Sequence, residues 1–250
     1  MRQAEADERP RLDALILCGG LGTRLRPVLG DLPKALAPVE GRPFLERLLE
    51  HLAAEGLERF VLCTGWRSDA IDAALPDLAR YGEVVTSRED KPLGTGGALR
   101  NARGLVRSDP LFVLNGDSLS NVGLAGMLRE HRARGATVTI AVVPADGHEG
   151  GMVRLGEGGR ILSFAEKVEP GQQSFCSAGL YLLSRSLLFE ASLSDEFSLE
   201  LDLFPRLVGR GVYGHVHDGS FLDIGTPERY DAAPRLLDAI VEAGCAEPKP

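Results

Sequence analysis

The stretch from Leu12 to Leu25 reads LDALILCGGLGTRL, and it decides the predicted fold. Its apolar run, Ala14–Cys18, has the length of a buried strand. Three glycines follow, and Thr23 and Arg24 come directly after them. Glycine lets backbone N–H groups approach phosphate oxygens, and an arginine adds a charged donor. The segment therefore predicts a strand that ends in a phosphate-binding loop, with an ordinary tight turn as the alternative.

From Leu12 onward, short apolar runs alternate with amphipathic stretches at helical period. This alternation predicts parallel strands joined by crossover helices. The predicted strands of this part are Ala14–Cys18, Arg59–Thr64, Glu83–Thr86, Leu111–Leu114 and Thr137–Val143. The predicted helices between them are Pro43–Glu55, Ser68–Leu75, Gly96–Ala102 and Val122–Ala133.

The last third of the chain departs from this alternation. Two short apolar runs flank the sequence GEGG, which predicts a hairpin of Met152–Leu155 with Ile161–Phe164. Further strands are predicted at Ser177–Leu183 and Val212–His217, and helices at Leu199–Val208 and Pro227–Ala243. We expect a single α/β domain over residues 12–244, whose later part is a substrate-facing lobe, with loose tails at 1–11 and 245–250.

The composition indicates a folded globular protein. Of 250 residues, 44% are hydrophobic and 26% are charged, which is close to the globular average. The formal net charge of −8 disfavours general attraction to nucleic acid or to an anionic membrane, so an anionic ligand must be met by local cations. No apolar run reaches the roughly 18 residues of a membrane helix, and the first residues lack the apolar core of a secretory signal.

Several residues of types that often bind metals or take part in catalysis are expected to have only structural or surface roles. The four cysteines, at positions 18, 63, 176 and 245, have none of the short spacings of zinc or redox sites, so we expect reduced thiols in a cytoplasmic protein. His215 and His217 would share one face of a strand, but no third ligand is suggested nearby, and we expect surface histidines. Asp13, Asp31 and the run 89–91 are expected to be solvated charges.

Two later segments extend the predicted phosphate site. Lys34 follows Pro33, ten positions after Arg24 and across a turn-rich sequence; a solvated lysine before a strand is the alternative. The segment Leu93–Leu99 reads LGTGGAL and is predicted to open a helix. Helix N-termini with small residues bind anions well, although a helix cap would explain two of these glycines equally.

Two carboxylates are predicted at strand ends. Asp117 follows the strand Leu111–Leu114 through Asn-Gly, and Asp223 follows the apolar run Ser-Phe-Leu that ends at Leu222. Ligands of open α/β sheets collect at the carboxyl ends of strands. The two carboxylates could therefore converge on one Mg²⁺, a hard cation that takes oxygen ligands and bridges phosphates; a turn-forming role is the alternative for Asp117.

The motif LxGGxGTRL followed by Pro-Lys resembles the sugar-phosphate nucleotidyltransferases, which join a nucleoside triphosphate to a sugar 1-phosphate. The later motifs keep the same order, so the resemblance spans about residues 12–230. It implies a Rossmann-like three-layer α/β/α fold with a mostly parallel central sheet, a nucleotide-binding part at about 12–143 and a small sugar-phosphate-binding lobe at about 144–244. The nucleotide-binding residues that it implies are Leu17, Gly19, Gly20, Gly22, Thr23, Arg24, Gly94, Thr95, Gly96 and Gly97.

The resemblance also implies chemical roles. Arg24 would hold the outgoing phosphates, Lys34 would neutralise charge at the reacting phosphoryl group, and Asp117 and Asp223 would be the Mg²⁺ ligands. These four are the predicted catalytic residues. A sugar-phosphate oxygen is already anionic, so direct attack on the α-phosphorus needs no general base and no covalent intermediate.

A further group is implied for the sugar phosphate. Glu166 would accept hydrogen bonds from sugar hydroxyls and Lys167 would hold the phosphate, with an ordinary polar strand end as the alternative. Ser177 stands where the family often has asparagine, so its contact with the sugar is open and bears on which sugar fits. The predicted sugar-phosphate-binding residues are Asn115, Glu166, Lys167, Ser177 and Gly179.

The motifs DLPKALAPV, KPLGTGGA, FSLELDLFP and FLDIGTP most closely resemble the bacterial D-glycero-α-D-manno-heptose 1-phosphate guanylyltransferases. This resemblance implies GTP and the heptose 1-phosphate as substrates, and GDP-heptose for surface glycans as the product. Glucose 1-phosphate thymidylyltransferases, mannose 1-phosphate guanylyltransferases and N-acetylmuramate 1-phosphate uridylyltransferases share the same catalytic residues and stay open. A homo-oligomer would be in keeping with the family.

Two other classes of function remain as alternatives. A non-catalytic nucleotide-sugar-binding regulatory protein could use the same fold, because fold alone does not confer activity. It would have no need of both metal carboxylates together with Lys34. A glycosyltransferase that consumes an NDP-sugar would usually show a D-x-D motif, whereas here the strand end reads Asn115-Gly116-Asp117.

Overall fold

The computed structural model describes residues 12–145, 151–165, 175–190, 193–218 and 220–244. Its centre is a parallel arrangement of four strands, in the order β6 (Leu111–Asn115), β1 (Asp13–Leu17), β4 (Arg59–Thr64) and β5 (Glu83–Arg88). All four were predicted from the apolar runs, with bounds that differ by at most two residues. Their carboxyl ends lie at one edge of the sheet, where ligands of such folds bind.

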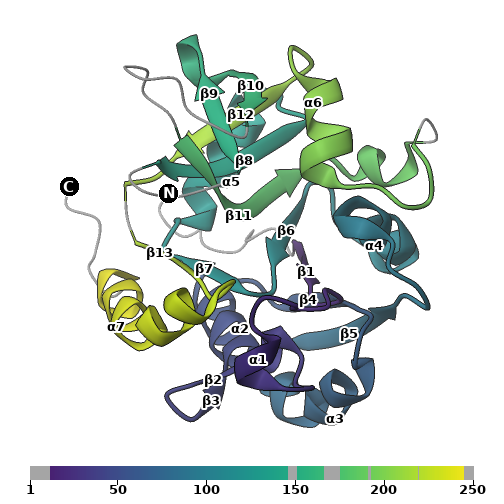
Figure 1. Ribbon diagram of the computed structural model, residues 1–250. Coiled ribbons are helices and arrows are strands. Elements are labelled where there is room, and N and C mark those ends of the chain that lie inside the picture. The colour runs from purple at the N-terminus through teal and green to yellow at the C-terminus, as the bar shows by residue number, and fades with distance from the viewer. Residues whose placement is uncertain (1–11, 146–150, 166–174, 191–192, 219, 245–250) are drawn as a thin grey trace, which may run out of the picture.

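Alternate residues of the central strands face two separate hydrophobic clusters. Ala14 and Ile16 on β1 pack into one cluster, while Leu15 packs into the other, because successive strand side chains point to opposite faces. The first cluster is covered by α2 (Phe44–Ala54), α3 (Ser68–Leu78), α5 (Leu124–Ala133) and α7 (Pro227–Gly244). The second is covered by α4 (Gly94–Ala102) and α6 (Phe204–Leu207), so that α2 and α4 lie on opposite sides of the sheet (Figure 1). The three-layer prediction is confirmed.

The sheet continues past β6 with strands of the other direction. The long strand β11 (Phe175–Leu183) runs antiparallel to β6 and also pairs with β8 (Val138–Pro144) and β9 (Met152–Leu155). β12 (Val212–Val216) lies beside β8, and β10 (Ile161–Ala165) completes the predicted hairpin with β9. These strands form the upper part of the molecule in Figure 1, beside the parallel core.

Two small sheets were not predicted, because strands of two or three residues carry no hydrophobic pattern. In one, β7 (Ser118–Ser120) pairs antiparallel with β13 (Phe221–Asp223). In the other, β2 (Pro38–Val39) pairs with β3 (Arg42–Pro43). The short helix α1 (Arg26–Leu29) and the 3₁₀ turns η1 (Lys34–Leu36), η2 (Ala79–Tyr81), η3 (Arg103–Leu105), η4 (Glu157–Gly159) and η5 (Arg185–Phe189) complete the connections.

The helix predicted over Leu199–Val208 differs in kind from the structure. It begins as a π-helical turn, η6 (Leu199–Leu203), and only its last residues form the α-helical turn α6. The Leu203 N–H donates to the Ser198 carbonyl, five residues before it, at 3.2 Å. Pro205 follows closely and has no N–H to offer, so a regular α-helical ladder cannot continue through this turn.

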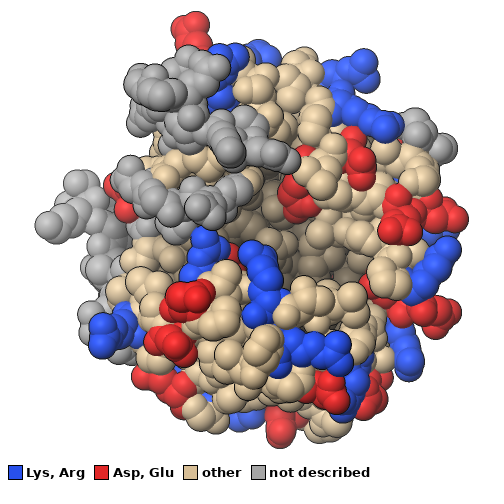
Figure 2. Space-filling view, in the orientation of Figure 1, with Lys and Arg blue, Asp and Glu red and all other residues tan. Residues whose placement is uncertain are grey.

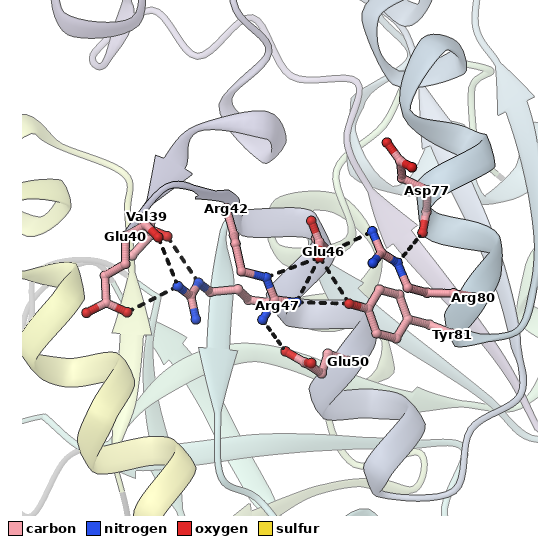
Figure 3. A network of polar contacts seen from close by, with 9 residues as sticks. All are labelled: Val39, Glu40, Arg42, Glu46, Arg47, Glu50, Asp77, Arg80 and Tyr81. Atoms are coloured by element: carbon pink, nitrogen blue, oxygen red, sulfur yellow. Dashed lines mark hydrogen bonds and ion pairs between the residues drawn. The ribbon is translucent and has the colours of Figure 1, made fainter.

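A polar network holds the β2–β3 hairpin against α2 and η2 (Figure 3). Glu46 on α2 accepts hydrogen bonds from Arg42 at 2.8 Å and from the Tyr81 hydroxyl at 3.1 Å, and Arg47 donates to the Val39 carbonyl at 3.1 Å. The hairpin follows directly after η1, which begins at Lys34. The network therefore fixes the backbone that carries this lysine.

The expectation of a solvated Asp13 is wrong. Its side chain is buried, accepts a hydrogen bond from Arg59 at 2.5 Å, and also accepts the backbone N–H groups of Arg107 and Ser108. These contacts join the beginnings of β1, β4 and β6 at the edge of the sheet opposite the glycine-rich loop. The sequence pattern gave no sign of this pair, because its partners are far apart along the chain.

Candidate active site

A cavity of about 200 Å³ lies at the carboxyl ends of β1 and β6. The surface is hollowed over this region, with lysine and arginine side chains along its lower rim (Figure 2). The lining comes from the glycine-rich loop, η1 and the turns after β6 and β13. Its residues are Leu17, Cys18, Gly20, Gly22, Thr23, Arg24, Lys34, Ala35, Gly116, Asp117 and Gly225. Most of the predicted residues of the first loop are thus brought together with Lys34 and Asp117.

Backbone geometry shapes the first loop for this position. Gly22 has φ +58°, and its carbonyl accepts the N–H groups of Leu25 and Arg26, which closes a turn before α1. A side chain at Gly116 would lie 2.7 Å from the Leu17 carbonyl oxygen, so only glycine lets the turn after β6 pack against the end of β1. The backbone conformation at Gly22 and the close packing at Gly116 therefore explain both glycines without a ligand.

Lys34 and Asp117 are in direct contact at the floor of the cavity. The Lys34 ammonium donates to one carboxylate oxygen of Asp117, and the Ser118 hydroxyl donates to the other at 3.2 Å. Their side chains are 15% and 28% exposed, so the pair is only partly screened by water. Arg24 also lines the cavity, and its guanidinium has no hydrogen bond or ion pair to the part of the chain described. Two cations therefore face the space, one paired and one available to an anion.

Asp223 lies next to Asp117 in the fold but faces other partners. The Ile224 N–H donates to the Asp117 carbonyl at 3.0 Å, and Asp223 is paired with Ser118 across β7 and β13. Its carboxylate accepts from the Gly225 N–H at 2.5 Å and from Arg229 at 2.7 Å. Gly225 lines the cavity, whereas Asp223 itself does not.

The two carboxylates suit a hard divalent cation. Each keeps acceptor capacity beyond its present hydrogen bonds, because a carboxylate offers about four lone-pair sites. Among the described residues no group of three or more histidine, cysteine or acidic side chains is placed to hold a metal ion. A cation here would take its other ligands from phosphates and water, which is how proteins usually hold Mg²⁺. The metal assignment of Asp117 and Asp223 stays a prediction.

The second glycine cluster forms the beginning of α4. The N–H groups of Gly96 and Gly97 donate to the Phe197 carbonyl at 3.0 and 3.3 Å, and a Cβ on Gly96 would overlap the Phe197 ring. Packing against the segment after η5 therefore explains these two glycines. Gly94 is exposed and Thr95 is half-buried. Nucleotide binding by residues 94–97 remains a prediction.

Three of the predicted sugar-phosphate residues meet where β6 and β11 run side by side. Gly179 has φ +68°, and a Cβ there would lie 2.7 Å from the Asn115 Nδ2. The Gly179 N–H donates to the Ser177 hydroxyl oxygen at 3.2 Å. Glycine is thus required by the close approach of Asn115. Glu166 and Lys167 lie outside the described residues.

Sequence reasoning missed Glu89, which was expected to be solvated. Glu89 is half-buried, and one carboxylate oxygen would lie 2.9 Å from a Cβ on Gly19 and 2.7 Å from one on Gly65. Its other oxygen accepts the Leu93 N–H at 3.3 Å. Burial raises the pKa of this carboxyl. Together with Trp66, Glu89 lines a second cavity of about 260 Å³ on the other side of the glycine-rich loop.

The histidine pair and the cysteines have structural surroundings. His217 Nε2 lies 2.7 Å from the Asn121 Oδ1, and His215 Nδ1 lies 3.2 Å from a Glu130 carboxylate oxygen, so the expected surface positions are only partly correct. Cys18, Cys63 and Cys176 are free and buried, as expected of reduced thiols. Burial raises the pKa of the Cys63 thiol to about 12, which makes it unreactive at neutral pH.

Comparison with known proteins gives consistent matches. A family model described as nucleotidyl transferase matches residues 13–238. A mannose-1-phosphate guanylyltransferase of Mycobacterium tuberculosis is 38% identical over 227 residues, which is 88% of this chain and 63% of that relative. A D-glycero-alpha-D-manno-heptose 1-phosphate guanylyltransferase of Aneurinibacillus thermoaerophilus is 32% identical and covers 90% of this chain and 98% of the relative.

Solved structures show the same relationship. The structure of HddC from Yersinia pseudotuberculosis complexed with GMP-PN has a TM-score of 0.76 and 33% identity, and covers 90% of this chain and 98% of that one. Among the described helices, none is long and apolar enough to cross a membrane. The similarity to these proteins covers about 90% of this chain and includes the residues that line the cavity.

Proposed function

The chain belongs to the nucleotidyl transferase family, and from this we propose that it joins a nucleoside triphosphate to a sugar 1-phosphate, giving an NDP-sugar and pyrophosphate. The observation that supports this most strongly is the convergence of Arg24, Lys34 and Asp117 on one cavity beside the glycine-rich loop. Both substrates are polyanions, whereas the protein carries a net charge of −8. Local cations of this kind are what such a reaction needs.

The chemistry follows from the substrates. An oxygen of the sugar phosphate attacks the α-phosphorus of the triphosphate, a new P–O bond forms, and the bond to the β-phosphate oxygen breaks. The electron pair of that bond leaves with pyrophosphate, which Arg24 is placed to receive. Lys34 offsets negative charge at the reacting phosphoryl group. The nucleophile is already anionic, so positioning and charge stabilisation suffice for catalysis.

Asp117 and Asp223 are the residues that would hold a divalent cation, with Mg²⁺ as the predicted ion. Such a cation would supply positive charge at the phosphate oxygens between these carboxylates and the glycine-rich loop. Lys34 would then be shared between Asp117 and a phosphate oxygen. Arg229 keeps Asp223 oriented through its 2.7 Å contact.

Glu89 supports guanine as the nucleobase. The Watson–Crick edge of guanine presents N1–H and an amino group, two donors that one carboxylate can accept together. Glu89 lies half-buried beside the glycine-rich loop, in a cavity that also offers the Trp66 ring. Uracil and thymine present an acceptor on either side of a single N–H, so a carboxylate would repel them. The relatives named above act, by their names, as guanylyltransferases.

For the sugar we propose a manno-configured 1-phosphate. The names of the two relatives specify mannose and D-glycero-D-manno-heptose, which share the configuration of the ring. The heptose 1-phosphate is the first candidate, because the sequence motifs most closely resemble the enzymes that use it. The product would be GDP-heptose, formed in the cytoplasm.

The experiment is a pyrophosphate-release assay with Mg²⁺ over a grid of substrates. GTP, dTTP, UTP, CTP and ATP are each combined with heptose, mannose, glucose and N-acetylated sugar 1-phosphates. One cell should dominate, with GTP and a manno-configured sugar. If another pair of substrates gave the highest rate, the proposed reaction would stand and the proposed substrates would be wrong. Silence in every cell with tight binding of GDP-mannose would favour a non-catalytic binding protein instead.

A further inference from the structure

One carboxylate, that of Glu200, joins two elements that hold different predicted substrates. Its Oε2 accepts hydrogen bonds from the Thr95 hydroxyl at 2.8 Å and from the Ser198 hydroxyl at 2.9 Å. Its Oε1 accepts from the Tyr181 hydroxyl at 3.0 Å. Thr95 is the second residue of α4, and Tyr181 lies on β11. Three hydroxyl donors on one half-buried carboxylate leave little freedom for its position.

The hydrogen bonds on the β11 side have a defined direction. The Gly179 N–H donates to the Ser177 hydroxyl oxygen at 3.2 Å. The Tyr181 hydroxyl proton is directed to Glu200, because a carboxylate can only accept. Ser177, whose oxygen lies 3.4 Å from that of Tyr181, must therefore donate to the tyrosine oxygen. Tyr181 is only 2% exposed, so its hydroxyl has no water to replace these partners.

The α4 side is equally determined. The Thr95 oxygen accepts the Leu199 N–H at 2.8 Å, and the Ser198 oxygen accepts the N–H groups of Glu200 and Leu201 at 3.2 and 3.1 Å. Ser198 has both acceptor positions used, so its proton must go to Glu200. The carboxylate is carried on the π-helical turn η6, a rare geometry that often marks functional sites.

We propose that Glu200 is a positioning residue that couples the sugar-phosphate side of the site to the nucleotide side. The inference rests on the proposed function and goes one step beyond it. Through Tyr181 and Ser177, Glu200 holds β11 where it meets Asn115. Through Thr95, it holds the beginning of α4 beside Glu89 and Leu93. A displacement on either side moves the shared carboxylate and is felt on the other.

The same geometry gives Ser177 a role different from that of an asparagine at this position. Its hydroxyl proton is engaged by Tyr181, and its oxygen accepts from Gly179. Ser177 therefore acts on the sugar side through β11 rather than by donating to a sugar hydroxyl. An asparagine amide could still donate a hydrogen bond to a sugar hydroxyl, whereas Ser177 has only one acceptor position left.

Three variants that remove side-chain contacts test the coupling. Thr95→Val removes the α4 contact of Glu200 together with the acceptor of the Leu199 N–H, and Tyr181→Phe removes the β11 contact together with the bond from Ser177. Glu200→Ala removes both contacts of the carboxylate and leaves the other two bonds in place. Dissociation constants for GTP and for mannose 1-phosphate are measured by calorimetry, and unfolding temperatures are measured beside them. We expect Thr95→Val to weaken GTP binding more than sugar-phosphate binding, Tyr181→Phe to have the reverse preference, and Glu200→Ala to weaken the binding of both ligands by about three- to tenfold.

Glu200→Gln separates the two arms. The amide oxygen can still accept from Thr95 and Ser198, but the amide nitrogen must donate to Tyr181, which reverses the bond between Tyr181 and Ser177. We expect GTP binding near that of the wild type and weaker sugar-phosphate binding. If the glutamine were only tolerated, neither dissociation constant would change. If it only destabilised the fold, both constants would rise alike. Either result would contradict the proposed coupling.

A double-mutant comparison decides between coupling and separate effects. With Glu200→Ala as the background, Thr95→Val and Tyr181→Phe should each raise the dissociation constants by clearly less than they do in the wild type, because only the bonds to Leu199 and Ser177 are then left to lose. Glu196→Gln, an exposed glutamate of the same segment, is the matched control and should leave both constants unchanged. Full additivity, or unchanged constants in a folded Glu200→Ala protein, would overturn the proposal. A wild type that binds both ligands without releasing pyrophosphate would contradict the proposed function only.

Discussion

The ammonium group of Lys34 contacts the carboxylate of Asp117 across 83 positions of sequence. Lys34 lies on a 3₁₀ turn held by the β2–β3 hairpin, and Asp117 lies in the turn after β6. The contact places a cation and a metal-ligand candidate at the same point of the cavity. In the proposed reaction this is where charge accumulates on the α-phosphate.

Lys34→Ala should reduce kcat by about 10²- to 10³-fold, the usual effect of removing one preorganised stabiliser of a developing charge. KM for the triphosphate should change less, because Arg24 and the glycine-rich loop remain. Steady-state pyrophosphate release measures both parameters. Arg103→Ala, an exposed arginine on η3, is the control and should behave as the wild type. Near-normal turnover in Lys34→Ala would remove this lysine from the mechanism.

Chelation tests the carboxylate pair. EDTA should abolish pyrophosphate release, and added Mg²⁺ should restore it. Asp223→Asn should require more Mg²⁺ for half-maximal rate, because one anionic ligand is lost. The exposed Asp72→Asn on α3 is the matched control. Full activity in EDTA, or an unchanged Mg²⁺ requirement in Asp223→Asn, would show that these carboxylates have another role.

Glu89→Gln should change stability in a pH-dependent way. Burial raises the pKa of the Glu89 carboxyl, so the folded protein disfavours its charged form. Its contribution is most favourable below the unfolded pKa, about 4.3, and is lost as pH rises through the folded value. The glutamine variant should therefore unfold at a higher temperature than the wild type at pH 7, and this gain should shrink toward pH 4.

Unfolding temperatures across that pH range provide the test, with Asp90→Asn as a neighbouring control. The same variant should lose preference for GTP over other triphosphates if Glu89 reads guanine. A gain in stability that is independent of pH would mean that the carboxyl is not the titrating group.

Asp13→Ala should destabilise the fold without touching the reaction. It leaves the largely buried Arg59 without its closest anion, which typically costs about 3–5 kcal/mol. For a chain of this size that is a fall in Tm of about 6–20 °C. Asp31→Ala breaks the exposed pair with Arg26 and should shift stability by less than about 1 kcal/mol. Calorimetric unfolding compares the two; equal effects would contradict the account of Asp13.

The sequence was sufficient for the central strands and for the first loop, because both depend on local pattern. A five-residue apolar run followed by glycines specifies β1 and its turn almost by itself, and Lys34 follows at a fixed spacing. Asp117 was predicted from its place at a strand end, the resemblance implied its role as a metal ligand, and the structure brings it to the same cavity. The carboxylate of Asp223 lies nearby but faces Gly225 and Arg229 instead.

The sequence was insufficient where a residue's environment is made by distant segments. Asp13 and Glu89 look like solvated charges along the chain. In the structure, Arg59 and the segment before β6 enclose Asp13, and the loops at Gly19 and Gly65 lie against Glu89. Glu200 lies within the motif FSLELDLFP, but its role depends on Thr95 and Tyr181, which are 105 and 19 residues away. The π-helical turn that carries it lies just before Pro205, and the helical period of this segment predicted an α-helix instead.

The central claim is that a sugar-phosphate oxygen attacks the α-phosphorus. The most direct measurement uses a manno-configured sugar 1-phosphate with ¹⁸O in its non-bridging phosphate oxygens, GTP and Mg²⁺, followed by ³¹P NMR of the products. The account predicts ¹⁸O in the oxygen that bridges the two phosphorus atoms of the GDP-sugar, and none in pyrophosphate. Label in pyrophosphate, or no labelled nucleotide sugar with any triphosphate, would contradict it.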